Sequence, residues 1–179
     1  MKLGTKSLLF GAHQFLIHPV MVACGWYKLY GFPKDYRLWL AFILHDIGYI
    51  GCETMDGDDG KKHTRLGADI MGDLFGKDWH ELCLYHSRFC AEMCNSKPSK
   101  LCFADKLAIA IEPSWLYLPR VMLSGEIKEY LLNQKNEFHL KNPNSNISIK
   151  DMIQWHQQLK QFIIRWVDEN VDTMEKQKE

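Results

Sequence analysis

Two adjacent polar residues, His45 and Asp46, constrain this chain most, because they follow directly on the apolar run 38–44. The run is typical of a buried helix, and Ile47 and Gly48 after the pair indicate a turn. An imidazole and a carboxylate beside such a run lose hydration, which is strongly unfavourable unless another group compensates. A bound cation is one strong compensator. Any fold of this chain must therefore supply partners for this pair.

Further residues of metal-binding types recur in segments with helical character. In chain order the set is His18, His45, Asp46, His63, His86 and Asp105. Imidazole nitrogens and carboxylate oxygens favour iron or manganese, with zinc, nickel, cobalt and magnesium as alternatives. The set holds more ligands than one tetrahedral zinc ion needs, so it predicts two divalent metal ions bridged by a carboxylate.

The hydrophobic pattern predicts an all-α protein of about six to eight helices, because no segment shows strand-like alternation of useful length. The expected helical segments are 6–29, 33–45, 63–75, 78–94, 98–112, a short irregular piece at 113–119, and 149–171. At 179 residues the chain is expected to form one domain. Its predicted parts are a metal-binding core at 1–125, a flexible connector at 133–148 and a C-terminal packing helix at 149–172.

The loop at 48–62 contains an acidic, glycine-rich stretch at 56–60. A calcium site is disfavoured there, because the stretch lacks the ligand spacing and the terminal glutamate of an EF-hand. We expect a mobile loop at the rim of the site. Residues 49–62 and 113–125 are also the expected walls of a substrate pocket.

Composition limits the partners and the compartment. The formal net charge is zero, which argues against a nucleic-acid polymer or an anionic membrane surface as partner. The six cysteines form no Cys-x-x-Cys pair and suit reduced thiols, so we expect a cytoplasmic protein. Polar residues interrupt the apolar N-terminal stretch, which disfavours a signal peptide, and no apolar run is long enough to span a bilayer. The sequence leaves the oligomeric state open.

Four motifs, in order, resemble those of HD-domain metalloproteins over roughly residues 10–120. Residues 18–23 are similar to the helix with the first histidine of the family, 42–48 to its His-Asp signature and 104–108 to the helix with its last aspartate. Residues 63–70 and 84–88 resemble the segments with two extra histidines in the dinuclear branch. That branch includes HD-GYP phosphodiesterases and HD-type diadenosine polyphosphate hydrolases.

The resemblance implies a single HD-type helical domain with two metal ions. One ion would be held by His18, His45 and Asp105, the other by His63 and His86, and Asp46 would bridge them. The implied activity is hydrolysis of a nucleotide or another small phosphoester by a hydroxide that bridges the ions. Lys106 and Arg88 follow proposed ligands in the chain and would neutralise phosphate oxygens, so with Asp46 they form the expected catalytic set.

The chain also departs from the family pattern. It lacks the Gly-Tyr-Pro triplet of the HD-GYP branch, which disfavours cyclic-di-GMP as substrate. Gly48 and Tyr49 stand where many relatives carry lysine or glutamate, and Glu53 is the nearest carboxylate that could replace it. His13 is an alternative to His18 as first ligand. We favour His18 because the Pro-x-x-Val-Ala motif follows it, and the two histidines would lie about 140° apart around a helix.

Two other functions fit the same residues. The ligand set is similar to that of HD-type di-iron oxygenases resembling inositol oxygenase, whose chemistry depends on the identity and redox state of the metal. A non-catalytic regulator that keeps its metals as structural staples is the third possibility. The histidines outside the motifs, His80, His139 and His156, are interpreted as hydrogen-bonded core residues.

Overall fold

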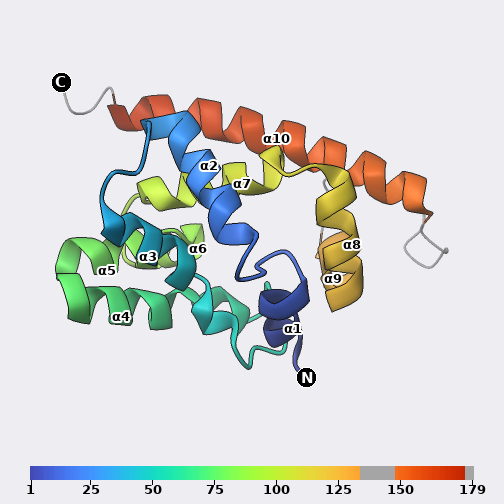
Figure 1. The fold of residues 1–179 in the computed structure, drawn as a ribbon, viewed down its shortest axis with the longest axis horizontal. Coiled ribbons are helices and arrows are strands. Elements are labelled where there is room, and N and C mark those ends of the chain that lie inside the picture. Colours follow the sequence, from blue (N-terminus) through green and yellow to red (C-terminus); the bar gives the residue numbers. More distant parts are fainter. Residues whose placement is uncertain (134–147, 176–179) are drawn as a thin grey trace.

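The computed structural model describes residues 1–133 and 148–175, and within these ranges all regular structure is helical (Figure 1). The elements are α1 (Leu3–Phe10), α2 (His18–Tyr30), α3 (Tyr36–Leu44), η1 (Ile47–Tyr49), η2 (Gly60–Lys62), α4 (Thr64–Phe75), α5 (Lys77–Leu84), α6 (Arg88–Met93), α7 (Lys100–Ile111), α8 (Ser114–Ser124), α9 (Glu126–Asn133) and α10 (Ile149–Glu175). The all-α prediction is confirmed for the described residues. The connector predicted at 133–148 and His139 fall almost entirely outside them.

Helices α2 and α7 form the centre of the arrangement. They pack against each other, and the long helix α10 runs along one side of the molecule over α7 and α8 (Figure 1). Helices α3, α4, α5 and α6 gather at one end, while α1, α8 and α9 lie at the other. None of the described helices combines the length and the apolar character needed to cross a bilayer.

Separate apolar clusters hold the two ends together. The cluster shared by α2, α3, α4, α5 and α7 has Val22, Phe42 and Met71 at its centre, all without exposed surface. Helices α8, α9 and α10 enclose Trp155, and α7 meets α10 around Val167. Helix α10 therefore packs on the core as the amphipathic pattern at 149–171 predicts.

The observed helix ends agree with the predicted ones where a residue near the end, such as a capping residue, determines the boundary. The predicted segments 33–45, 63–75, 98–112 and 149–171 correspond to α3, α4, α7 and α10 with small shifts at their ends. Asp35 illustrates a local signal, because its side chain accepts a hydrogen bond of 2.9 Å from the backbone N–H of Arg37 and so caps α3.

The single helix predicted at 6–29 is wrong, because a turn at 11–17 separates α1 from α2. Gly11 lies so close to the carboxylate of Glu126 that a Cβ there would overlap it. Arg120 donates a hydrogen bond of 2.7 Å to the Gly11 carbonyl oxygen. Pro19 then occupies the first turn of α2, where its missing N–H is not required. The break depends on contacts from α8 and α9, which no local pattern contains.

The helix predicted at 78–94 is also divided, into α5 and α6, and His86 lies in the break. Ser87 starts the second piece, because its hydroxyl accepts a hydrogen bond from the backbone N–H of Cys90. Conversely, α8 continues through Pro119 to Ser124 instead of ending at the proline. The carbonyl that loses its donor there is that of Trp115, a well-exposed residue, so water can bond it.

The rim loop is tied to α9, a helix that the sequence pattern did not predict. The Glu129 carboxylate accepts hydrogen bonds from the backbone N–H groups of Met55 (3.0 Å) and Asp56 (2.8 Å). The Met55 side chain is buried beneath the loop, at 2% exposure. Within the loop, the Thr54 hydroxyl donates to Asp59 at 2.5 Å. These contacts place the loop 50–59 across the α1 end of the molecule.

Candidate metal centre

Three of the histidines stand at the C-terminal ends of helical segments and are oriented in the same way. His45 follows α3, His63 follows η2, and His86 follows α5 after one residue. In each case Nδ1 lies within hydrogen-bond distance of the carbonyl oxygen three residues earlier, at 3.0, 2.6 and 2.5 Å respectively. The last carbonyls of a helix have no partner within it, so Nδ1–H donates to them. The Nε2 lone pair of each ring then points away from the helix.

The other two ligand candidates come from the paired central helices. His18 is the first residue of α2, and Asp105 lies in the middle of α7. Because α2 and α7 pack against each other, the two side chains meet, with His18 Nε2 3.1 Å from Asp105 Oδ1. Both residues are at least 95% buried.

These residues form a first group of four possible metal ligands: His18, His45, Asp46 and Asp105. The Nε2 atoms of His18 and His45 are 3.3 Å apart. Asp46 Oδ2 lies 3.2 Å from the first of these nitrogens and 3.0 Å from the second. Two ligand atoms about 2.1 Å from one ion lie about 3.0 Å apart at a right angle and about 3.4 Å apart in a tetrahedron. The spacing therefore suits one shared ion.

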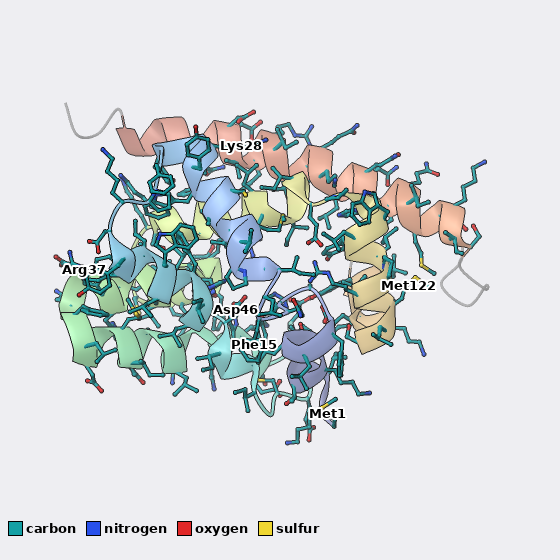
Figure 2. All side chains as sticks on the ribbon, in the orientation of Figure 1. Met1, Phe15, Lys28, Arg37, Asp46 and Met122 are labelled. Atoms are coloured by element: carbon teal, nitrogen blue, oxygen red, sulfur yellow. The ribbon has the colours of Figure 1, made fainter. Side chains whose placement is uncertain are left out.

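Asp46, His63 and His86 form a second group. The Nε2 atoms of the two histidines are 3.1 Å apart, and each lies 3.3 Å from Asp46 Oδ1. The Asp46 carboxylate thus turns one oxygen to each group. Figure 2 shows Asp46 in the interior of the molecule, between the two ends of the fold. This is the arrangement of a carboxylate that bridges two cations.

The polar atoms in the centre test whether cations fit. With Nδ1–H donating to the backbone, His45 and His86 face the centre with lone pairs, which repel one another and the carboxylate oxygens. Asp46 Oδ2 is buried and accepts no hydrogen bond from the described residues. A buried carboxylate oxygen without a donor is strongly unfavourable. Two divalent ions would satisfy both the nitrogens and this oxygen, so the donor set fits them.

The pKa values of the histidines also indicate that positive charge is favoured beside Asp46 and Asp105. Burial lowers the pKa of His45, but the carboxylates of Asp46 and Asp105 outweigh burial and raise the pKa to about 10. The pKa of His18 is raised by the same balance. For His86, burial prevails and lowers the pKa to about 4. The two carboxylates therefore attract protons when no other cation neutralises them.

The turn after the His-Asp pair closes one side of the centre. Gly48 lies so close to the carbonyl of His63 that any Cβ would overlap it. The next residue, Tyr49, stacks on the His63 ring with a centroid distance of 3.9 Å and an interplanar angle of 8°. Tyr49 is 6% exposed. Gly48 and Tyr49 together thus pack the rim loop against the second group.

The structure also places the other site candidates. His18, not His13, belongs to the first group. Lys106 donates a hydrogen bond of 3.2 Å to Asp105 Oδ2, the oxygen that does not face His18. The Arg88 guanidinium lies over the Trp166 ring of α10, 5.1 Å from its centroid. Glu53 is exposed and paired with Lys2, so it does not approach either group. The catalytic roles of Asp46, Lys106 and Arg88 remain predictions.

The histidines outside the motifs differ from one another. His156 is fully buried, and its Nδ1 lies 2.9 Å from Ser114 Oγ, as expected for a core histidine. His80 is half-exposed and paired with Asp69 at 3.3 Å, so its interpretation as a core residue is wrong. His80 lies beside Gly72 of α4, where its ring reaches the exposed Asp69 carboxylate.

Sequence reasoning missed the residues that hold the turn before His18. Glu112 and Arg120 form a buried ion pair, and Arg120 also bonds the Gly11 carbonyl. Glu126 accepts hydrogen bonds of 3.2 Å from the backbone N–H of Ala12. These side chains lie about a hundred residues along the chain from the turn, and nothing in the local sequence around them indicates that they contact it.

Comparisons with models of known protein families, with curated proteins and with solved structures found no match to this chain.

Proposed function

We propose that the protein is an HD-type, metal-dependent phosphohydrolase that acts on a nucleotide or another small phosphoester. The observation that carries the proposal is the orientation of Asp46, whose two carboxylate oxygens face different pairs of imidazoles. Two divalent ions bound there would polarise a phosphoryl oxygen and lower the pKa of a water molecule between them. The order of the motifs along the chain supports the HD type.

The two groups differ in a way that suits a substrate. The first group offers four protein ligands, and the second offers three. Fewer protein ligands leave more positions for a substrate oxygen or water. Four imidazoles among the ligands favour iron, manganese, zinc, cobalt or nickel over magnesium, which prefers oxygen ligands. We therefore propose iron or manganese first.

Two cationic side chains could bind the phosphate of the substrate. Lys106 is about one-third exposed, and its ammonium has three donors, one of which bonds Asp105. The Arg88 guanidinium lies over the Trp166 ring, and a guanidinium in such a contact can still donate in a bidentate manner to phosphate. Zero net charge and these few local cations favour a small phosphorylated substrate over a nucleic-acid polymer.

A di-iron oxygenase is the second candidate, and one observation favours it. Asp46, His63 and His86 form a set of two histidines and one carboxylate, which is the ligand set of many non-haem iron oxygenases. The two candidates differ in the need for dioxygen rather than in the ligands. Anaerobic assays therefore separate them.

The test combines elemental analysis with activity. Protein purified without chelators should hold close to two divalent ions per chain. It should release phosphate from a nucleotide or phosphoester in an anaerobic screen with manganese, iron, nickel or cobalt. Asp46→Asn should abolish turnover, whereas Asp69→Asn, the same change on the outer face of α4, should retain it. Turnover that strictly requires dioxygen would select the oxygenase, and metal-free protein with no turnover would contradict both.

A further inference from the structure

His13 lies in the turn between α1 and α2, beside the metal centre but outside both ligand groups. Its ring contacts that of His18 at a centroid distance of 5.3 Å and that of Tyr49 at 4.7 Å. His18 belongs to the first group, and Tyr49 is stacked on His63 of the second. His13 therefore borders both halves of the centre.

A chain of hydrogen bonds fixes which nitrogen of His13 carries the proton. Ser7 Oγ is fully buried and lies 2.7 Å from His13 Nδ1. The Ser7 hydroxyl also interacts with the carboxyl group of Glu126, which accepts from the Ala12 N–H and the Tyr130 O–H. A carboxylate only accepts, and a hydroxyl has one proton. Ser7 therefore donates to Glu126 and accepts from Nδ1–H of His13, which leaves a lone pair on Nε2.

The position of this imidazole is fixed by the residues before it, and its second nitrogen is not among the fully enclosed side-chain atoms that lack a partner. Arg120 bonds the carbonyl of Gly11 at 2.7 Å, and Glu126 bonds the N–H of Ala12, so α8 and α9 clamp the residues just before His13. The residue is largely buried but keeps some exposed surface, and Nε2 has no hydrogen-bond partner in the described part of the chain. The result is a fixed acceptor at the edge of the centre.

We propose that His13 is a positioning residue whose Nε2 accepts a hydrogen bond from the water consumed in the reaction, with Ser7 and Glu126 holding the acceptor in place. This inference rests on the proposed hydrolase function. In that reaction the water oxygen forms a bond to phosphorus, and the bond from phosphorus to the leaving oxygen breaks. The leaving oxygen keeps the electron pair, and the released proton passes to bulk water. An acceptor on one side of the water turns its lone pair toward phosphorus, which is an orientation effect. His13 needs no change of protonation for this role.

Kinetics of three variants test the role. In manganese-loaded protein with bis(p-nitrophenyl) phosphate or p-nitrophenyl phosphate, His13→Phe keeps an aromatic ring against Tyr49 but removes the acceptor. We expect kcat to fall by about tenfold or more, with KM changed less than about twofold. His13→Gln should restore part of kcat, because its amide oxygen is an acceptor, and Ser7→Ala should lower kcat by a smaller factor. The matched control His80→Phe should keep the kcat of the natural protein. An unchanged kcat in His13→Phe would overturn the proposal.

Two further measurements do not depend on activity. The metal content of His13→Phe should equal that of the natural protein, and a loss of one ion would show that His13 is a ligand instead. In zinc-loaded protein with ¹⁵N-labelled histidine, NMR should show His13 protonated on Nδ1 with Nε2 bare and not coordinated. A proton or a metal on Nε2 would overturn the assignment. If the natural protein hydrolyses no phosphoester, the proposed function fails, and this spectrum still decides whether His13 is an acceptor.

Discussion

Tyr49 stacks face to face on His63, and this contact links the rim loop to one of the two ligand groups. The tyrosine covers one face of that ring, so it limits the ring's rotation toward or away from Asp46. Groups that orient a ligand from the second layer typically change metal affinity by about 10- to 100-fold when they are replaced.

We therefore expect Tyr49→Leu to weaken binding of one of the two ions by about tenfold while the other is retained. Titration of metal-free protein with manganese, followed by calorimetry, would measure both affinities. Tyr49→Phe is the matched control and should bind like the natural protein, because it keeps the ring. Equal affinities in the leucine and phenylalanine variants would contradict the role of the stack.

Replacement of the bridging residue should affect both ions, whereas replacement of a terminal ligand should affect one. Asp46→Asn removes the negative charge that both groups share, so we expect metal content to fall from about two ions per chain to well below one. His86→Gln should leave about one ion, because the first group keeps all of its ligands. Elemental analysis after dialysis measures this. The same loss in both variants would indicate that Asp46 does not bridge.

The protein should lose much more stability when one partner of the buried Glu112–Arg120 pair is replaced than when both are replaced. Burial raises the pKa of Glu112, and the neighbouring Arg120 opposes that rise. Arg120→Met leaves the carboxyl group buried without its cation, for which we expect a loss of about 3–5 kcal/mol in the free energy of unfolding. The double variant Arg120→Met with Glu112→Gln should recover part of the loss. Urea unfolding at neutral pH measures it, and equal losses in the single and double variants would refute the explanation.

Most of the centre could be predicted from the sequence, because its signals are local. The histidines follow or begin helical segments, Asp46 comes directly after His45, and Asp105 interrupts the apolar pattern within α7. His18, His45, His63, His86, Asp46 and Asp105 are the six that the structure brings together. The split of the set into two groups also follows the prediction, whereas the reaction catalysed remains a proposal.

The remaining features depend on contacts between distant parts of the chain. The break at Gly11 exists because Glu126 and Arg120 bind the turn from α8 and α9. The apolar spacing continues across this turn, so hydrophobic periodicity alone predicts one uninterrupted helix at 6–29. The hydrogen bonds from the loop to Glu129 are equally invisible locally, because a glutamate on an amphipathic helix is ordinarily a surface residue.

Acid should destabilise the α8–α10 end of the molecule through His156. Burial lowers the pKa of this histidine from 6.5 to about 4 in the folded protein. Between these values the unfolded chain binds more protons than the folded one, so stability is lost as the pH falls from about 6.5 to about 4. The expected loss is about 3 kcal/mol.

Comparison with His156→Gln isolates this effect from that of the other titrating groups. At neutral pH the variant should be less stable, because it loses the stack on Tyr117, whose ring lies 4.4 Å away. The stability difference between natural protein and variant should then shrink as the solution is acidified. Urea unfolding at a series of pH values measures the difference, and a value independent of pH would show that His156 does not titrate as inferred.

Glu129 should determine how often the rim loop opens. Its carboxylate accepts hydrogen bonds from the backbone N–H groups of Met55 and Asp56. Glu129→Ala should increase amide hydrogen exchange at these two positions by about tenfold, while exchange in α7 stays unchanged. Exchange in Glu129→Gln should lie between that of the natural protein and that of Glu129→Ala, because the glutamine amide oxygen can still accept these hydrogen bonds. Equal exchange in all three proteins would show that the apolar contacts of Met55 alone hold the loop.

The bonds from His45, His63 and His86 to carbonyls three residues earlier mean that these rings are aimed by the main chain itself. The hydrogen bond that sets each aim needs no partner side chain, and only His63 has in addition a stacked ring, that of Tyr49, against it. Any helix end of suitable direction becomes a prepared ligand through a single change to histidine. A centre assembled in this way can be gained stepwise, one helix terminus at a time.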